Sequence, residues 1–336
     1  MKTAIFGYAG CGKTSLFTAM AGPGSTGQDR AMVKVPEPRL EPLVRLFTPK
    51  KTTYSEIEYL DIPGGGTPGK GLGDRVLSEI RPYDCLLAVL DAFSGVVDPA
   101  DQIQGLEADF IIADLAVVEK RLERIDLDKR RAKDLVDPRE EAELRKAMAM
   151  LEAEQPLRLD QDVANAPELR GFKFLSAKPV LYAWNLPEDQ VIAFSAPEAT
   201  PGTAHVAVSA ALEADLAGID DPDERAEFMA DMGLTESALD RIIAGTYALL
   251  GLITFLTAGD KEVRAWAIRR GETAPEAAGT IHSDIQKGFI RAEVLGWDDF
   301  LKAGDFKKAK ELGLHRLEGK TYIVQDGDII EFRFNV

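Results

Sequence analysis

The stretch Gly7–Thr14 constrains the fold of this chain more than any other feature of its sequence. It matches in full the pattern G-x-x-x-x-G-K-[ST] of phosphate-binding loops. Glycines let backbone N–H groups converge on phosphate oxygens, Lys13 neutralises the β- and γ-phosphates, and the Thr14 hydroxyl ligates Mg²⁺. The motif joins Thr3–Phe6, predicted as a strand, to Lys13–Met20, predicted as a helix. A nucleoside triphosphate site in an α/β domain is therefore predicted.

The residues expected to contact the nucleotide phosphates follow directly from the motif. They are Ala9, Gly10, Cys11, Gly12, Lys13, Thr14 and Ser15. The helix that follows adds its positive end to the N–H groups of the loop. Lys13 and Thr14 are also the expected catalytic residues of the loop, and we interpret Cys11 as a small filler rather than a redox group.

Four more segments, of which Ser55–Asp61 alternates between polar and apolar residues, are predicted as strands of the same sheet. They are Ser55–Asp61, Cys85–Asp91, Lys178–Trp184 and His205–Ser209. A nearly continuous apolar run such as Cys85–Asp91 suits a central parallel strand covered by helices. The expected fold class is α/β, with a doubly wound, mostly parallel sheet over residues 1–114 and 172–220. Ligands bind such sheets at the C-terminal ends of the strands.

A segment of different texture, residues 115–171, interrupts this pattern. Apolar residues recur at helical spacing in two highly charged stretches, at Leu115, Val118, Leu122 and Ile125 and again at Leu144, Met148 and Leu151. Asp137 followed by Pro138 is a helix-start signature. We predict two antiparallel helices that form a projecting hairpin; the narrow apolar stripe also fits helices packed flat on the sheet.

The last part of the chain is predicted to form a small mixed α+β domain, residues 252–336, after a helical linker, residues 221–251. The expected strands and helix are Ile253–Leu256, Glu262–Ala267, Pro275–Ile281 (helix), Phe289–Leu295 and Ile329–Phe334. The first two strands are expected to pair around Gly259.

Composition narrows the classes of protein that remain. No apolar run of about 18 residues and no secretory signal is present, so we expect a soluble, cytoplasmic protein without a membrane partner. The two cysteines are too few for a disulfide framework. The net charge is −16, but residues 252–336 hold 13 Lys and Arg against 14 Asp and Glu, whereas the remainder holds 27 against 42. The C-terminal segment is therefore the part best able to approach RNA, although an ordinary neutral domain fits the same count.

Asp61-Ile62-Pro63-Gly64 follows the second predicted strand of the sheet. An aspartate at this strand end can hold Mg²⁺ through water, so Asp61 joins Thr14 as an expected metal residue. The Gly64 N–H can contact the γ-phosphate, which makes Gly64 a catalytic candidate. The glycine-rich continuation to Gly73 predicts a mobile switch loop.

Two elements are expected to face the base. The first, Asn185-Leu186-Pro187-Glu188, stands where GTPases commonly carry N-K-x-D, whose aspartate pairs with guanine. Because Leu186 and Glu188 replace the lysine and the aspartate, adenine becomes a serious candidate. The second is Ser209-Ala210-Ala211, which fits an S-A-K element without its lysine.

These residues, with others along nearly the whole chain, resemble the YchF subfamily of Obg-like ATPases, which are translation-factor-class P-loop proteins. The segments that carry the resemblance include Val35–Leu40, Lys70–Gly73, Ile80–Asp84, Ala113–Leu115, Lys178–Tyr182, Lys261–Trp266, Gly288–Glu293, Tyr322–Asp328 and Phe332–Val336. The resemblance implies a nucleotide domain, a helical hairpin and a C-terminal β-grasp (TGS) domain. It also implies ATP preference through Asn185 and Glu188, and association with the ribosome or RNA through the TGS domain and the hairpin. We expect a monomer.

Three departures from the family pattern stand out. Ala9 and Gly10 replace an asparagine of the family P-loop, which removes the side chain expected to support a bound monovalent cation. Gly65 follows Gly64 where the family has a hydrophobic residue and many GTPases have a glutamine. Only Gly22–Met32 separates the first helix from the next apolar run, so switch I is short.

The family also has a histidine loop after its third strand, whereas residues 92–99 of this chain hold no histidine. The three histidines are His205, expected to pack at a strand, His282, expected to hydrogen-bond locally, and His315. Two functions remain open: a slow ATPase, and a nucleotide-gated binding or assembly module with little hydrolysis. GTP-specific hydrolysis is a third alternative, although the element from Asn185 to Glu188 favours adenine over guanine.

Overall fold

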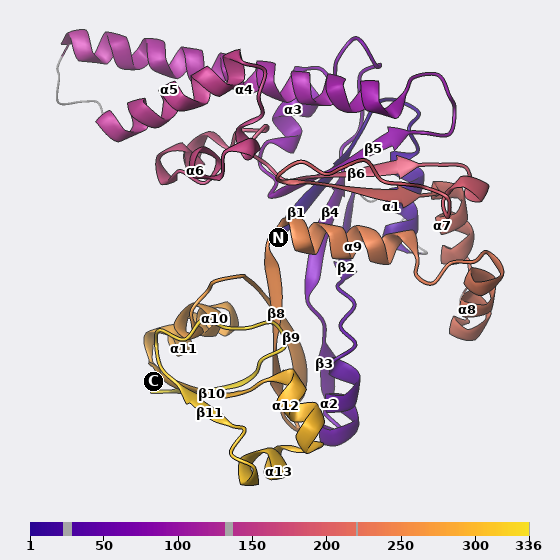
Figure 1. Ribbon diagram of the computed structural model, residues 1–336, viewed down its shortest axis with the longest axis vertical. Coiled ribbons are helices and arrows are strands. Elements are labelled where there is room, and N and C mark those ends of the chain that lie inside the picture. The colour runs from indigo at the N-terminus through magenta and orange to yellow at the C-terminus, as the bar shows by residue number, and fades with distance from the viewer. Residues whose placement is uncertain (23–28, 132–136, 220, 336) are drawn as a thin grey trace. The chain divides into compact units, whose positions relative to one another are not determined.

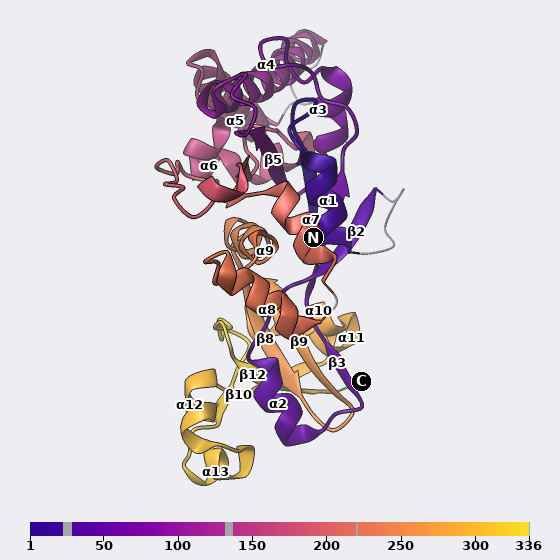
Figure 2. The ribbon, with the colours of Figure 1, turned by 90° about the vertical axis from the view of Figure 1, so that its right-hand side faces the viewer.

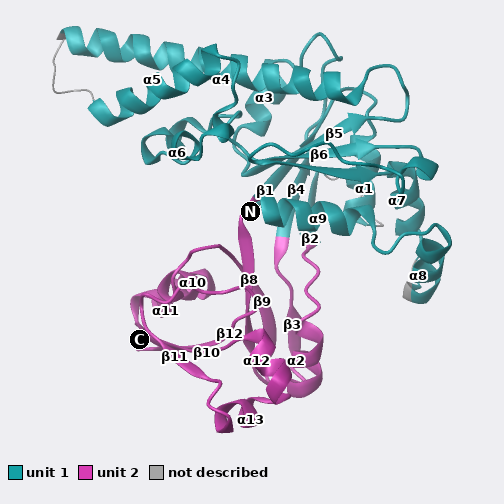
Figure 3. Ribbon diagram, in the orientation of Figure 1, with its two compact units in different colours: residues 1–33, 57–249 teal, residues 34–56, 250–336 magenta. Residues whose placement is uncertain are grey.

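The computed structural model describes residues 1–22, 29–131, 137–219 and 221–335. The chain divides into two compact units (Figure 3), one formed by Met1–Val33 with Ile57–Leu249 and the other by Lys34–Glu56 with Leu250–Val336. They are called unit 1 and unit 2 below. Most of the short switch I segment, residues 23–28, lies outside the described residues, and so does Val336.

Unit 1 is built on a six-stranded sheet (Figure 1). In spatial order its strands are β2 (Arg30–Lys34), β4 (Glu56–Asp61), β1 (Lys2–Phe6), β5 (Cys85–Asp91), β6 (Val180–Asn185) and β7 (Thr203–Val208). The pairs β1–β4, β1–β5, β5–β6 and β6–β7 are all parallel. The predicted α/β fold with a doubly wound, mostly parallel sheet is confirmed, and β2 is an additional strand at its edge.

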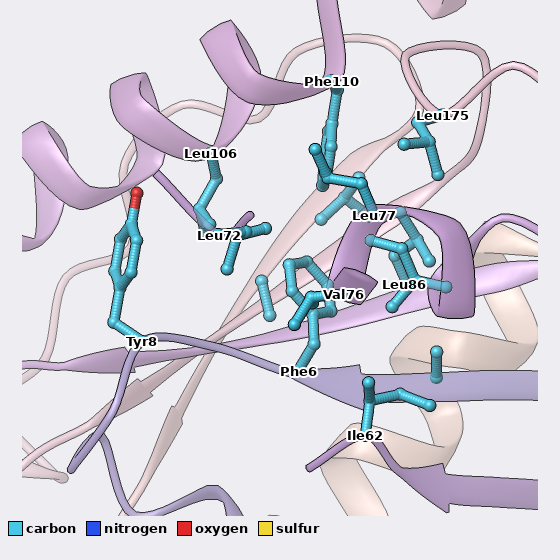
Figure 4. Packing of buried hydrophobic residues seen from close by; sticks show 14 of the residues in the cluster. Phe6, Tyr8, Ile62, Leu72, Val76, Leu77, Leu86, Leu106, Phe110 and Leu175 are labelled. Atoms are coloured by element: carbon cyan, nitrogen blue, oxygen red, sulfur yellow. The ribbon is translucent and has the colours of Figure 1, made fainter. Parts of the chain in front are cut away.

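Helices cover both faces of this sheet (Figures 1 and 2). On one face lie α3 (Asp74–Ile80) and α4 (Pro99–Arg131), and on the other α1 (Lys13–Ala21), α7 (Ala210–Ala217) and α9 (Ala238–Leu249). Figure 4 shows the packing under α3 and α4, where buried side chains of the two helices meet Phe6 and Leu86 of the sheet. The apolar alternation of the strands thus supplies both faces of the core.

The helical hairpin is formed by α4 and α5 (Pro138–Glu152), which run side by side. Asp137 caps α5 by accepting a hydrogen bond from the Arg139 N–H at 2.9 Å, as its position before Pro138 predicts. Both predicted apolar stripes are buried in one cluster, with Val118 and Ile125 against Leu144 and Leu151.

The first helix of the hairpin begins earlier than the sequence analysis predicted. It starts at Pro99 rather than near residue 115, and its first turns pack on the sheet through Leu106 and Phe110. Both alternatives for this segment are therefore partly realised, since α4 lies on the sheet first and then continues into the hairpin. Short turns of helix, η2 (Leu157–Leu159), α6 (Gln161–Ala164) and η3 (Pro167–Phe172), lead the chain back to β6.

Residues 221–251 are not the linker that the sequence analysis predicted. They form α8 (Pro222–Asp231) and α9, and α9 packs against β6 and β7 within unit 1. The Tyr59 hydroxyl of β4 donates to Thr246 of α9 at 3.0 Å, and both residues are buried. Within the described residues, no helix combines the length and the apolar character that a membrane crossing requires.

Unit 2 contains a second six-stranded sheet, which is mixed. In spatial order its strands are β11 (Arg316–Glu318), β10 (Phe289–Leu295), β12 (Ile329–Phe334), β8 (Leu252–Ala258), β9 (Glu262–Arg269) and β3 (Lys51–Thr53). Its helices are α2 (Leu40–Phe47), α10 (Ala274–Ile281), α11 (Ser283–Lys287), α12 (Trp297–Ala303) and α13 (Phe306–Glu311). The predicted pairing of β8 and β9 around Gly259 is present and antiparallel.

Residues 34–56 correct the predicted domain boundaries. They were predicted to belong to the nucleotide domain, but β3 pairs in parallel with β9, with Thr53 opposite Arg264. Leu43 of α2 packs in the same core as Leu256 of β8. The Arg39 guanidinium donates to Asp326 at 2.7 Å, so a segment close to the N-terminus completes the C-terminal unit.

This arrangement predicts that Leu43, which is distant in sequence from the main part of unit 2 (Leu250–Val336), contributes to the stability of that unit. Leu43 is fully buried, and replacing it with alanine is expected to cost about 2–5 kcal/mol of unfolding free energy. Leu43→Ala should accelerate amide exchange in β8 and β9, measured by hydrogen exchange with mass spectrometry. Leu46→Ala, on the same helix but 41% exposed, is the control and should leave the exchange of these strands unchanged. Equal effects of the two variants would contradict the shared core.

Candidate nucleotide-binding site

The predicted phosphate loop connects β1 to α1, as its motif requires. Gly10 and Gly12 have φ angles of +83° and +89°, a region that favours glycine. Helical geometry leaves the first N–H groups of α1 without intrahelical partners, so they can serve an anion. Cys11 is buried, and burial raises the pKa of its thiol, which favours the filler role over a reactive thiolate.

The backbone of the loop approaches its neighbours more closely than a side chain would allow. A Cβ atom at Gly7 would lie 2.5 Å from the carbonyl oxygen of Val89 on β5. A Cβ atom at Gly12 would lie 2.2 Å from the Asn185 amide nitrogen. The glycines of the motif therefore serve packing against the sheet as well as the approach of phosphate.

Asn185 ties the phosphate loop to a second predicted element. Its Nδ2 donates to the Cys11 carbonyl at 2.9 Å, and its Oδ1 accepts from the Ala210 N–H at 2.9 Å. The side chain is buried at the end of β6, and both of its functional groups are used. One amide thus brings together the loop and the start of α7.

The other residues expected to face the base lie around Asn185. The Leu186 N–H donates to the Val208 carbonyl at 2.8 Å, and Ser209 caps α7 through its hydroxyl. Ala211 is exposed in the first turn of that helix, and Glu188 is exposed at the start of the short helix η4 (Glu188–Gln190). The segments 185–188 and 209–211, which are about 25 residues apart in sequence, therefore lie together at the C-terminal ends of β6 and β7.

Thr14 and Asp61 form a pair of oxygen donors suited to a divalent cation. The Thr14 hydroxyl donates to Asp61 Oδ2 at 3.2 Å. Asp61 Oδ1 is buried and accepts no hydrogen bond from any residue that the structure describes. Oxygen ligands are what Mg²⁺ prefers, and it usually keeps waters and substrate phosphates as its other ligands. The two residues predicted from sequence therefore fit a magnesium site.

The loop after Asp61 lies directly on the phosphate loop. Gly64 has a φ angle of +90°, and the Gly66 carbonyl accepts from the Ala9 N–H at 3.1 Å. A Cβ atom at Gly65, whose φ is +143°, would lie 2.2 Å from the Gly7 carbonyl oxygen. Ala9 was expected to contact phosphate, but its N–H is bound to this loop.

A cavity of about 460 Å³ adjoins the phosphate loop. It lies between α1 and α7, and its lining includes Thr14, Ser15, Thr18, Ala214, Ala217 and Gly218. Because these side chains are small, the groove between the two helices stays open next to the expected phosphate position.

The end of β5 is held by a residue that the sequence analysis missed. The buried Gln102 side chain of α4 accepts from the Asp91 N–H at 3.0 Å and donates to the Asp91 carbonyl at 2.7 Å. It also donates to the Val97 carbonyl at 3.1 Å. A single glutamine belongs to no motif, so nothing in the local sequence indicated this role.

Two histidines have the roles that the sequence analysis proposed. His205 stacks on Tyr182 with ring centroids 5.3 Å apart and accepts from the Trp184 indole at 3.1 Å. Burial lowers the pKa of His205, which suits a neutral packing residue. His282 accepts from the Asp284 N–H at 3.2 Å and caps α11.

Comparison with known proteins decides the family. A family model described as "YchF-GTPase_C: Protein of unknown function (DUF933)" matches residues 252–335. The chain is 39% identical to the "Ribosome-binding ATPase YchF" of Bacillus subtilis, over the full length of both, and 39% identical to that of Escherichia coli O157:H7, over all of this chain and 99% of the relative. The chain belongs to the YchF family.

A solved structure agrees with this YchF assignment. The YchF GTPase of Schizosaccharomyces pombe matches with a TM-score of 0.88 and 29% identity, over 99% of this chain and 97% of that chain. Because the match covers nearly the whole of both chains, it includes the C-terminal sheet of this YchF family member as well as its phosphate-binding segment. The resemblance stated from the sequence is confirmed.

The bridge made by Asn185 generates a prediction for this YchF family member. Asn185→Asp replaces the N–H₂ donor to Cys11 with a buried carboxylate oxygen that faces the carbonyl. Leaving such a group unsatisfied costs about 1–3 kcal/mol, so ATP binding, measured by isothermal titration calorimetry, should weaken by about tenfold or more. Asn165→Asp makes the same chemical change at an exposed position and should bind like the wild type. Unchanged affinity in Asn185→Asp would contradict a role of this bridge in ATP binding.

Proposed function

We propose that this chain binds ATP with Mg²⁺ through residues 7–14 and hydrolyses it slowly, as a nucleotide-dependent switch that associates with the ribosome or RNA. The observation that carries the proposal is the Asn185 side chain, which joins the Cys11 carbonyl of the phosphate loop to the Ala210 N–H of the second base-facing element. This bridge supports one site that contains both the phosphate and the base elements. The relatives' name, "Ribosome-binding ATPase YchF", supports both ATP and the ribosome.

The binding chemistry follows from the residues at the loop. N–H groups of residues 10 and 12–15 and the positive end of α1 would receive the phosphates, since the Cys11 N–H donates to the Tyr8 carbonyl at 3.3 Å, and Lys13 would neutralise the β- and γ-phosphates. Thr14 and Asp61 would hold Mg²⁺, which would supply positive charge to offset that of the phosphates. The Gly64 N–H would contact the γ-phosphate and thereby report whether it is present.

Slow hydrolysis is favoured by the geometry at Gly65. Many GTPases carry a water-orienting glutamine at this position, but here the backbone leaves no space for a Cβ atom beside the Gly7 carbonyl. Residues 92–99 also lack a histidine. Catalysis would depend on the charge stabilisation that Lys13 and the metal provide, without a general base from this loop. The same geometry supports the second candidate, a nucleotide-gated binding module with little hydrolysis.

Base selection falls to residues around Asn185 rather than to its amide, because that amide is already used by the backbone of the protein. Leu186 and the exposed carboxylate of Glu188 are then the groups that would distinguish adenine from guanine. Position 186 is a leucine, so no lysine side chain is available there to cover the base, which weakens the case for a GTP-specific GTPase. The relatives named as ATPases support adenine.

Unit 2 is the proposed contact for RNA, as its charge differs sharply from that of unit 1. It holds 18 Lys and Arg against 17 Asp and Glu, a balance of +1, whereas unit 1 holds 22 against 39, a balance of −17. A polyanion is therefore repelled less by unit 2. Lys287 and Arg291 are exposed there, while the Arg264 guanidinium lies 3.7 Å from the centre of the Trp266 ring and has a packing role as well. The helical hairpin is the second proposed contact.

The proposal predicts that hydrolysis depends on Lys13. Lys13→Ala should abolish single-turnover hydrolysis of radiolabelled ATP, because the main cation for the β- and γ-phosphates is lost, while Lys120→Ala, at an exposed position of α4, should behave as the wild type. Adding ribosomes to the wild type tests whether a partner completes the site. Turnover that survives in Lys13→Ala would contradict ATP hydrolysis at this site. If the wild type shows no turnover with or without ribosomes, the nucleotide-gated binding module is the remaining function.

A further inference from the structure

The loop between Gly64 and Gly73 is pinned at two ends, and its first anchor is the phosphate loop. The Gly66 carbonyl accepts from the Ala9 N–H at 3.1 Å, and Gly65 sits with its backbone against the Gly7 carbonyl. Only residues without a Cβ atom can pack this closely, so this half of the loop follows the position of the phosphate loop.

The second anchor is α4, the first helix of the hairpin. The Leu72 N–H donates to Asp109 Oδ2 at 2.8 Å. The Leu72 side chain is buried, and Figure 4 shows it beneath Leu106, with Phe110 further along the same helix. A Cβ atom at Gly71 would lie 2.8 Å from Asp109 Oδ1, so the glycine lets the carboxylate close on the backbone.

Between the two anchors, the two halves of the loop contact each other. The Lys70 N–H donates to the Thr67 carbonyl at 2.9 Å, and Thr67 and Gly71 form a β-bridge. A Cβ atom at Gly66 would lie only 1.5 Å from the Gly71 carbonyl oxygen. Because the two halves of the loop touch, a displacement at Leu72 is carried to Gly66 and hence to Gly64.

The same turn of α4 also meets the phosphate loop. Gly105 lies inside this helix, where glycine costs about 1 kcal/mol relative to alanine. A Cβ atom there would lie 2.8 Å from the Tyr8 hydroxyl, which Figure 4 shows directed toward the helix. Burial raises the pKa of the Asp109 carboxyl, and the Leu72 N–H opposes that shift by stabilising the carboxylate. Where α4 contacts the phosphate loop and the loop 64–73, it therefore contains two residues that are unfavourable by themselves, the helical Gly105 and the partly desolvated Asp109.

We propose that Asp109 is a positioning residue for ATP hydrolysis: by holding the Leu72 N–H it fixes the loop that presents Gly64 to the γ-phosphate. The inference rests on the proposed function, and it adds a residue that lies outside every motif of the site. Asp109 itself touches neither nucleotide nor metal in this account. It acts through Leu72, so its removal should change the rate of the chemical step more than the affinity for ATP.

The test compares Asp109→Ala with Asp109→Asn in the full-length protein. Asp109→Ala should lower the single-turnover rate constant for ATP by about tenfold or more while the Kd for ATP changes by less than about threefold. Asp109→Asn keeps an acceptor for the Leu72 N–H and should retain most of the rate. Exchange of the Leu72 amide, followed by hydrogen exchange, should accelerate in Asp109→Ala alone. Glu119→Ala removes an exposed acid from the same helix and should match the wild type.

The outcomes separate the inference from the proposed function. A wild-type rate in Asp109→Ala, or equal losses of rate and affinity in both Asp109 variants, would overturn the inference while ATP hydrolysis by the wild type stands. If the wild type hydrolyses no ATP, the ATPase proposal fails. The exchange experiment then decides the anchor, because a non-hydrolysable ATP analogue with Mg²⁺ should slow exchange at Leu72 in the wild type and not in Asp109→Ala. No difference between those two proteins would refute it.

Discussion

The site depends on backbone segments that approach one another where no Cβ atom fits. Gly7 lies against the Val89 carbonyl of β5, and Gly65 lies against the Gly7 carbonyl in turn. Gly12 leaves the space that the Asn185 amide fills from β6. Two strands and one loop are thereby held around the phosphate loop by contacts that a single methyl group would break. The glycines of a phosphate-binding motif are usually explained by the phosphate, but here they also order the protein around it.

A buried carboxylate further along α4 binds the segments that lead into β5 and β6. Asp114 of α4 is fully buried and accepts hydrogen bonds from the N–H groups of Leu175 and Ser176 and from the Arg81 guanidinium. Burial raises the pKa of Asp114, and these bonds and the nearby cation oppose the shift. A buried carboxylate with such a set of partners is costly to disrupt, since losing one partner leaves a charge uncompensated. Arg81 directly follows α3, so Asp109 and Asp114 hold the start and the end of the segment 72–81 on one helix.

The sequence predicted the parts whose signals are local. Strands such as Cys85–Asp91 and Phe289–Leu295 were predicted with their observed bounds, because a buried strand is a continuous or alternating apolar run. The start of α5 followed from Asp137 and Pro138, and the site elements followed from motifs at strand ends. Each of these signals lies within a few residues of the structure that it specifies.

What the sequence did not reveal depends on partners far along the chain. β3 has only three residues, and it becomes a strand through its pairing with β9, about 210 residues later. α9 was assigned to a linker because its apolar face gives no indication of which sheet it covers. Asp109 and Gln102 belong to no motif, and their roles arise only when α4 lies on the sheet. The one local hint was Gly105 inside a helix, an unfavourable residue that indicates a close contact.

The most direct test of the account is equilibrium competition between ATP and GTP for the full-length wild-type protein in the presence of Mg²⁺. The proposed site implies that ATP binds, that GTP displaces it only at clearly higher concentrations, and that chelating Mg²⁺ weakens binding, because Thr14 and Asp61 would hold the metal and the segment 185–188 would select the base. Displacement of ATP by an equal or lower concentration of GTP, or binding that is indifferent to Mg²⁺, would contradict it.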